Sequence, residues 1–373
     1  DRLVFRLWPN SPDLARAGAH LDVGSVTVGG TEVKGTLESP TRLVVPLPGP
    51  IPPGEEVEAG LTWSLRIPES VDDRLSITGD AVRLGSFFPI LSWEPGFGWA
   101  TDPATGGFAE DSTAPTADFD VTISTPPGLT VLASGVPDRP GHWTATAMRD
   151  VAISVGTFTT AETTATAPNP VKITIGVESS VGDSADTYAS KAQAVVEDFG
   201  RRFGPYPWPT LSISITPHLG GGIEYPSHIM QGPGTFGDVE AHEIGHQWFY
   251  GLVGNDQGRD PWLDEGLATW AESRYQDSLG SLRLVTLPAA AREHLGEPMT
   301  YWKDQRDVYQ SGVYVQGALA LDALGPADLV DCALRVYVAQ NAYRIARPAD
   351  LAAALGAVFP DAKATLERFG AKL

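Results

Sequence analysis

Two histidines and one glutamate have the residue types and the spacing of a metal-ligand set. His242 and His246 lie four positions apart, so on a helix both imidazoles project from one face. Eighteen residues separate His246 from Glu265, which leaves room for a second helix to present the carboxylate. Two neutral imidazole nitrogens and one carboxylate oxygen leave the fourth tetrahedral position of a catalytic Zn²⁺ open for water. The pattern predicts one zinc ion per chain.

Glu243 lies about 100° around the same helix from His242, where it can reach that water without being a ligand. It is therefore the candidate general base, which accepts a proton from the water and later delivers one to the leaving amine. The alternatives are a solvated helix residue for Glu243, and capping or packing roles for the two histidines. Apolar residues on both sides of the motif, such as Ala241 and Trp248, indicate a buried helix. They favour the catalytic zinc site of a hydrolase.

Four further short motifs lie before and after the two histidines. Glu265 stands in Trp-Leu-Asp-Glu-Gly at residues 262–266, and residues 203–207 read Phe-Gly-Pro-Tyr-Pro. Residues 221–226 read Gly-Gly-Ile-Glu-Tyr-Pro, and residues 314–318 read Tyr-Val-Gln-Gly-Ala. Together these motifs resemble the aminopeptidase N family of zinc exopeptidases, which also includes leukotriene hydrolase.

The resemblance implies roles for several residues around the metal. Glu224 matches the glutamate that binds the α-ammonium group of the substrate in that family. Gly221 and Gly222 match the glycine-rich strand that hydrogen-bonds the substrate backbone. Tyr314 matches the tyrosine whose hydroxyl stabilises the developing oxyanion, a contribution worth about 3 kcal/mol in such sites, and Tyr309 is a weaker candidate for that role.

This chain departs from the family's pattern at some of these motifs. Tyr225 stands where Asn is usual, and Val315 and Gln316 stand where Glu and Lys are usual. The alternatives are therefore an exposed glutamate after a glycine turn for Glu224, and a core tyrosine for Tyr314.

Five more residues are weaker candidates. Asp80 lies near the position from which the family draws a second amine-binding residue, although an aspartate after Gly79 is better explained by a turn. Asp264 and Thr269 can orient a zinc ligand, or cap and pack the second helix. His218 and His228 flank the glycine strand, and we first expect them to be surface or hydrogen-bonded histidines.

The hydrophobic pattern divides the chain near residue 170. Before it, residues such as Leu61, Trp63 and Leu65 alternate with polar ones, as in half-buried strands. After it, the period is helical over 188–203, 314–324, 326–338, 348–357 and 361–371, and strands are expected over 211–215 and 223–230. We expect a multidomain α+β protein, with an N-terminal antiparallel β domain over residues 1–170. By the resemblance, residues 171–373 form a thermolysin-like zinc peptidase domain with a helical C-terminal part.

Composition excludes several classes of partner. The 373 residues carry a formal net charge of −20, which argues against nucleic acid and anionic membranes as partners. No apolar run reaches the length of a membrane span.

The single cysteine, Cys332, excludes an internal disulfide and is expected to be buried on a helix. A chain that starts at Asp1 without an initiator Met favours a secreted or cell-surface location over a cytoplasmic one.

The expected activity is that of a zinc-dependent aminopeptidase, which removes the N-terminal residue from peptides with a free N-terminus. Two alternatives stay open: a zinc endopeptidase of the same fold, and a noncatalytic peptide-binding protein. Family members usually continue into a large C-terminal helical domain, whereas this chain stops shortly after Tyr314. We expect a compact, bacterial-type member without that domain, with a more open cleft that tolerates peptides of varied length.

Overall fold

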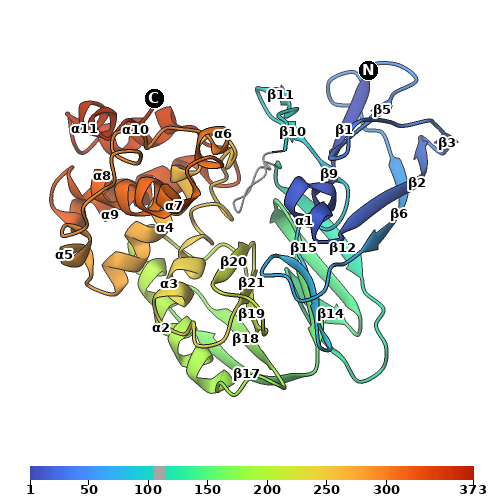
Figure 1. Ribbon diagram of the computed structural model, residues 1–373, viewed down its shortest axis with the longest axis horizontal. Coiled ribbons are helices and arrows are strands. Elements are labelled where there is room, and N and C mark those ends of the chain that lie inside the picture. The colour runs from blue at the N-terminus through green and yellow to red at the C-terminus, as the bar shows by residue number, and fades with distance from the viewer. Residues whose placement is uncertain (105–113) are drawn as a thin grey trace.

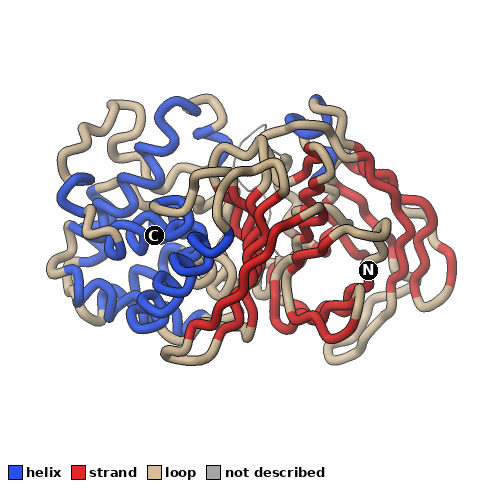
Figure 2. The backbone as a smooth tube through the Cα atoms, turned by 90° about the horizontal axis from the view of Figure 1, so that it is seen from below, coloured by secondary structure: helices blue, strands red, loops and turns tan. Residues whose placement is uncertain are grey.

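The computed structural model describes residues 1–104 and 114–373. Figure 1 shows a strand-rich N-terminal part beside a C-terminal part in which helices surround one side of a sheet. Figure 2, seen from below, shows most of the helices on one side and most of the strands on the other. The expected α+β fold class is confirmed. No helix among the described residues has both the length and the apolar character needed to cross a membrane.

The N-terminal part is built from small antiparallel sheets. Among its described residues every strand pair is antiparallel, as the period-two alternation predicts. The strand orders are β4-β5-β1-β9, β3-β2-β6, β13-β16-β8-β7, β12-β15-β14 and β10-β11. The elements are β1 (Arg2–Arg6), η1 (Trp8–Asn10), α1 (Pro12–Arg16), β2 (His20–Val28), β3 (Thr31–Glu32), β4 (Thr36–Ser39), β5 (Arg42–Pro46), β6 (Ala59–Arg66), β7 (Leu75–Thr78), β8 (Ala81–Leu84), β9 (Ile90–Leu91), β10 (Trp93–Glu94), β11 (Gly98–Trp99), β12 (Ala117–Thr122), β13 (Thr130–Ala133), β14 (Val136–Arg139), β15 (His142–Met148) and β16 (Ile153–Gly156).

A five-stranded sheet supports the C-terminal part, in the order β17-β18-β19-β21-β20. Its three central strands are parallel and its two edge strands run antiparallel to them. The strands are β17 (Phe158–Ala165), β18 (Val171–Glu178), β19 (Thr210–Ile215), β20 (Gly222–Tyr225) and β21 (His228–Gln231). The boundary expected at residue 170 lies in the turn between β17 and β18, so both strands of this hairpin belong to one sheet.

Helices follow in the order that the periodicity predicts. In α2, six residues at helical spacing are fully buried, and burying a side chain such as Phe199 contributes about 2 kcal/mol. The helices are α2 (Ala185–Phe203), α3 (Asp238–Gly245), α4 (Trp262–Tyr275), α5 (Leu279–Leu282), α6 (Met299–Trp302), α7 (Arg306–Tyr309), the π-helix η2 (Gln310–Val315), α8 (Gln316–Asp322), α9 (Ala327–Asn341), α10 (Pro348–Gly356) and α11 (Ala362–Arg368).

Three local predictions need correction. The zinc-motif helix was expected to continue past Trp248 but ends at Gly245, with His246 as its C-cap in helical geometry. The expected single strand over 223–230 is a hairpin, in which β21 lies inside the sheet and β20 forms the edge. Cys332 lies on α9 as expected, yet it is exposed, because it faces away from the buried side of that helix.

His228 lies in the interior of the sheet and is fully buried. Its ring nitrogens lie 2.7 Å from the Ser212 hydroxyl and 2.9 Å from the Ser154 hydroxyl. Neither hydroxyl can carry a compensating negative charge, so burial lowers the pKa of His228 to about 3. The neutral imidazole is therefore the form that the fold stabilises.

This burial predicts a loss of stability in mild acid. The unfolded chain protonates His228 below its ordinary pKa of about 6.5, whereas the folded protein does so only near pH 3. The unfolded state thus binds more protons between these values, and the free energy of unfolding should fall by about 2 kcal/mol from pH 7.5 to pH 5.0 on this account. Urea denaturation at both pH values should show a smaller decrease for His228→Gln than for the wild type. An equal decrease in both proteins would contradict this role.

Candidate active site

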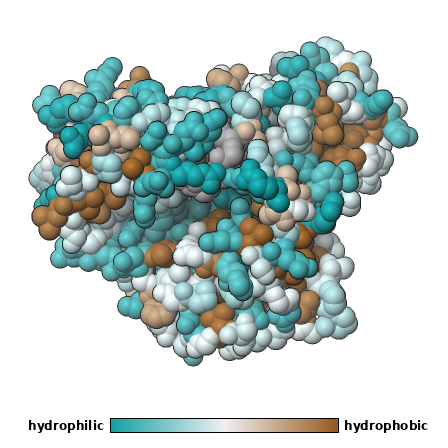
Figure 3. All heavy atoms as spheres, viewed as in Figure 1, coloured by the Kyte–Doolittle hydropathy of each residue, from teal (hydrophilic) through white to brown (hydrophobic). Residues whose placement is uncertain are grey.

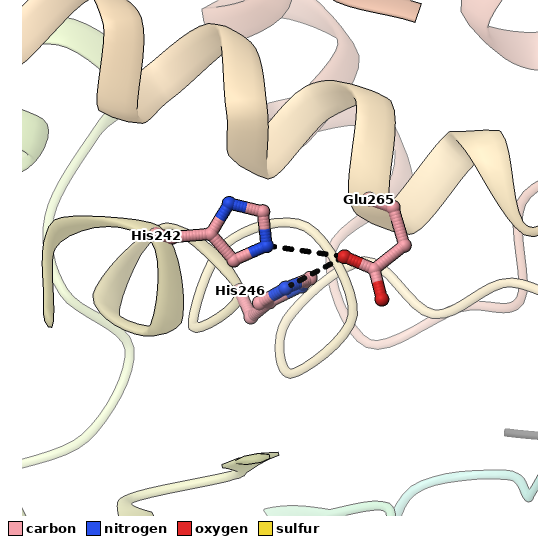
Figure 4. Close-up of side chains that lie close together, drawn as sticks. All are labelled: His242, His246 and Glu265. Carbon is pink, nitrogen blue, oxygen red and sulfur yellow. Dashed lines mark hydrogen bonds and ion pairs between the residues drawn. The ribbon is translucent and has the colours of Figure 1, made fainter. Parts of the chain in front are cut away.

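The predicted metal ligands meet in the structure. His242 comes from α3, His246 from its C-cap, and Glu265 from the first turn of α4 (Figure 4). The Nε2 atoms of His242 and His246 lie 3.1 Å and 3.4 Å from Oε2 of Glu265. One ligand atom from each of the three residues lies within 4.8 Å of the other two. The structure therefore brings the three residues of the predicted set together at one place.

A second set of carboxylates orients the imidazoles. His242 Nδ1 lies 3.2 Å from Oε2 of Glu272, and His246 Nδ1 lies 2.5 Å from Oδ1 of Asp264. Donation from Nδ1–H to these carboxylates leaves both Nε2 lone pairs directed at the ligand position. Gln257 in turn donates to Asp264 over 2.6 Å. Of the two roles predicted for Asp264, orienting a ligand or capping the second helix, its contact with His246 fits the first.

Glu272 was missed at the sequence level, although a signal for it existed. It follows Glu265 by seven residues, or two helical turns, and so lies on the same face of α4. Thr269, between them, lines the site, and its hydroxyl has no hydrogen-bond partner among the described residues.

The charges around the ligand set favour a cation. Burial opposes protonation of His242, but hydrogen bonds to Glu265 and Glu272 raise its pKa to about 10. Burial likewise opposes protonation of His246. The charge of Asp264 overcomes this effect and raises the pKa of His246 well above its usual range. A site that holds protons this strongly attracts positive charge. Two imidazoles and a carboxylate, with carboxylates behind the imidazoles, suit Zn²⁺ in chemistry and in number.

Glu243 and Glu224 lie beside the ligand set, and only 5% and 7% of their surfaces are exposed. Burial raises the pKa of Glu243 to about 7 and that of Glu224 to about 8. Oε2 of Glu243 has no hydrogen-bond partner within the described ranges. Both carboxylates also lie close enough to His246 for one oxygen of each and an imidazole nitrogen to fall within 4.8 Å of one another. Two proton-accepting groups are thus available at the metal position.

These residues face a cavity of about 480 Å³, which we call the zinc-site cavity. Gly221 and Gly222 form part of its wall beside Glu224. A Cβ atom on Gly222 would overlap the side chain of Glu243, so only glycine allows strand β20 to pass this close to α3. The lining residues are Gly221, Gly222, Glu224, Asp238, Val239, His242, Glu243, His246, Glu265, Thr269, Glu272, Leu282, Gln310, Tyr314 and Val315.

Tyr314 also lines the cavity, from the π-helix η2. Its ring stacks on the imidazole of His242, with centroids 5.5 Å apart and planes inclined by 10°. Burial and the charge of Glu265 raise the pKa of Tyr314 well above its usual range, so its hydroxyl remains a proton donor. Tyr309 packs its ring against Tyr314 in the core and is not part of the cavity lining.

The remaining candidates lie elsewhere. Asp80 lies in the exposed turn between β7 and β8, and its pKa is lowered chiefly by a hydrogen bond to Thr157. The predicted turn role therefore describes Asp80 better than amine binding. His218 is exposed and His228 is buried and hydrogen-bonded, as first expected.

A second cavity, of about 420 Å³, adjoins the first, and we call it the outer cavity. The two cavities share Gly221, Gly222, Glu224, Glu265 and Tyr314 as lining residues. The outer cavity is otherwise lined by Asp13, Arg16, Asp72, Asp73, Arg74, Leu219, Ile223 and Arg306. Apart from Ile223, which belongs to the motif at residues 221–226, these residues lie in no motif, and most come from a loop and a short helix of the N-terminal part, so sequence reasoning did not find them.

The contact between Glu272 and His242 predicts a role in metal affinity. Replacing Glu272 with Gln keeps the size of the side chain but removes the charge that orients His242. We expect zinc affinity, measured by competition with a chromophoric chelator, to fall about 10- to 100-fold. Glu367→Gln on α11 removes a half-exposed carboxylate and is the matched control. If both variants retain wild-type zinc affinity, the contact has no orienting role.

Comparisons with known proteins agree with this geometry. Over 192 residues the chain is 28% identical to aminopeptidase B from Homo sapiens, an alignment that covers 43% of this chain and 30% of that protein. It is 32% identical over 111 residues to leukotriene A-4 hydrolase from Xenopus laevis, covering 28% of this chain and 17% of the relative. The chain thus spans less than a third of the length of these relatives.

Solved structures share the fold over the whole chain. A mutant of an M1 zinc metallopeptidase from Deinococcus radiodurans superposes with a TM-score of 0.73 at 20% identity, covering 100% of this chain and 87% of that one. The same mutant bound to a Tyr-Ser-Ala substrate gives a TM-score of 0.71 at 22% identity, with the same coverage.

Residues 231–369 match the peptidase family M1 domain. This segment contains the three predicted metal ligands, Glu243 and Tyr314, while Glu224 lies on the strand that precedes it. The sequence match over this segment and the ligand geometry agree, and this part of the chain is similar to the peptidase family M1 domain.

Proposed function

We propose that this protein is a zinc-dependent aminopeptidase that hydrolyses the N-terminal bond of peptides with a free N-terminus. The observation that carries the proposal is the buried carboxylate of Glu224, which lies next to the metal ligands on the wall of the same cavity. A carboxylate at this place can bind a substrate's ammonium group, so that cleavage occurs one residue from the chain end. The aminopeptidases among the relatives support this reading.

His242, His246 and Glu265 would hold the zinc ion, with Glu272 and Asp264 fixing the two imidazoles. Zn²⁺ bound there would supply Lewis-acid activation of water and of the scissile carbonyl. The protein's own contribution is a preorganised ligand set that lines the zinc-site cavity.

Glu243 is the proposed general base. Its side chain lines the zinc-site cavity, and a pKa raised to about 7 by burial matches the neutral pH at which a base must both accept and return a proton. The same carboxyl can then donate that proton to the leaving amine. Because Gly222 allows β20 to pass against Glu243, the base and the strand that binds substrate are held at contact distance.

Glu224 and the glycines of β20 are the proposed substrate anchors. Pairing with an α-ammonium ion would favour the charged form of Glu224, whose pKa burial otherwise raises to about 8. As an edge strand, β20 has unpaired backbone groups on its outer side, where an extended peptide can add its own hydrogen bonds. Gly221 and Gly222 keep that side clear of side chains.

Tyr314 is the proposed donor to the carbonyl oxygen as negative charge develops there. Its position against His242 places it beside the ligand set, and its high pKa keeps the hydroxyl proton in place at neutral pH. Donation from a neutral tyrosine in a buried site is worth several kcal/mol in the transition state.

A panel of aminoacyl anilides tests the function directly. Each anilide is offered with a free amine and with an N-acetyl group, in the presence of zinc and of a chelator. We expect chelator-sensitive release of the chromophore from the free-amine substrates alone, because Glu224 binds the ammonium group. Cleavage of acetylated substrates would favour an endopeptidase. Absence of turnover in zinc-loaded protein that still binds peptides would favour a binding protein.

Glu243→Gln tests the general base. We expect kcat to fall by about 10²- to 10⁴-fold with zinc content unchanged, because the amide keeps the shape but cannot accept the proton. Glu240→Gln is the matched control, because Glu240 lies on the same helix, is 1% exposed and does not line the cavity. Wild-type kcat in Glu243→Gln, or an equal loss in the control, would refute the assignment.

A further inference from the structure

An ion pair between distant parts of the chain forms part of the lining of the outer cavity. Nη2 of Arg306, the first residue of α7, lies 2.9 Å from Oδ2 of Asp13 on α1. The other oxygen of Asp13 lies 2.6 Å from Nη1 of Arg16. All three residues line the cavity. The pair therefore joins the N-terminal part to the helical part at the cavity wall.

The ion pair joins α1 to α7, although both of its side chains stay partly exposed. The side chains of Arg306 and Asp13 are 48% and 28% exposed, so both remain accessible from the solvent. Partial burial acts to raise the pKa of Asp13, but hydrogen bonds from Arg306 and Arg16 lower it. The carboxylate therefore stays charged at neutral pH. Figure 3 shows a hydrophilic band that crosses this face of the molecule above a hollow.

The shared residues of the two cavities indicate where the parts of a substrate would lie. With its ammonium group at Glu224 and its scissile carbonyl at the ligand set, the first Cα of a peptide lies where the cavities join. The zinc-site cavity continues along α3 and α5, past Val239 and Leu282, and offers room for the leaving peptide. The outer cavity is then the space for the first side chain.

We propose that the Asp13–Arg306 ion pair is the outer wall of the pocket for the substrate's first side chain, and that it limits the size of that side chain. This inference rests on the proposed aminopeptidase function. A small first residue would fit inside the wall, whereas a large one would have to displace the pair.

The test compares alanyl and tryptophanyl anilides in variants that remove the wall. In Arg306→Ala and in Asp13→Ala we expect the ratio of kcat/KM for the tryptophanyl over the alanyl substrate to rise about five-fold, the upper range for an exposed ion pair. Because both changes remove the same contact, the double variant should give the same ratio as either single variant. The change in the ratio should come from a higher kcat/KM for the tryptophanyl substrate.

Arg283→Ala is the matched control. It breaks an ion pair of similar geometry, 2.6 Å between Arg283 and Asp322, and neither residue lines the zinc-site or the outer cavity. Its substrate ratio should equal that of the wild type.

The outcomes separate this inference from the function on which it rests. If the wild type hydrolyses free-amine anilides but the ratio is unchanged in both variants, the ion pair is not the pocket wall and the aminopeptidase function stands. An equal loss on both substrates would show that Arg306 supports the fold around Tyr314 and would also overturn the proposal. Failure of the wild type to hydrolyse any free-amine substrate would instead overturn the proposed function itself.

Discussion

The structure depends on placing several carboxylates and two imidazoles together in a region that water barely reaches. Isolated buried charges are costly, and here burial raises the pKa of Glu224 and Glu243 towards and above neutrality. The two imidazoles offset part of this cost by pairing with the carboxylates of Glu265, Asp264 and Glu272. A dication at the ligand position would offset more. The fold around the site therefore serves to hold acidic groups near one another until a cation joins them.

Two close backbone approaches make this arrangement possible. At Gly222, β20 passes so near α3 that any side chain would overlap Glu243. At Gly266 the helix α4 meets α8, where a Cβ atom on Gly317 would lie 2.6 Å from the Cα of Gly266. The first approach sets the distance between Glu243 and β20. The second brings η2 against α4, so that Tyr314 reaches the metal ligands. Glycine is required at both places because packing leaves no room for a side chain.

The N-terminal part contributes to the site as well as to the fold. Its residues Asp72, Asp73 and Arg74 line the outer cavity, and the hydroxyl of Tyr225 connects Arg74 to Ser86, over 3.4 Å and 3.1 Å respectively. Ser86 in turn donates to the buried Asp150 over 2.9 Å. Tyr225, which stands where the family usually has Asn, thus joins the substrate strand to the N-terminal sheets. This connection gives a structural reason for the departure.

The sequence by itself determined the candidate ligand set, the neighbouring Glu243 and most helices of the C-terminal part. These features follow from local rules: residues four apart on a helix share a face, and buried helices repeat their apolar residues every three to four positions. The resemblance supplied Glu224 and Tyr314, and both line the zinc-site cavity.

Only the tertiary structure decided how the site is enclosed. Asp13 and Arg306 are 293 residues apart, and no periodicity or motif joins them. The end of α3 at Gly245 and the π-helix around Tyr314 also depend on packing against neighbouring helices rather than on local preference. Contacts between distant loops depend on how the domains pack against one another. The pattern of residues along the chain does not contain that information.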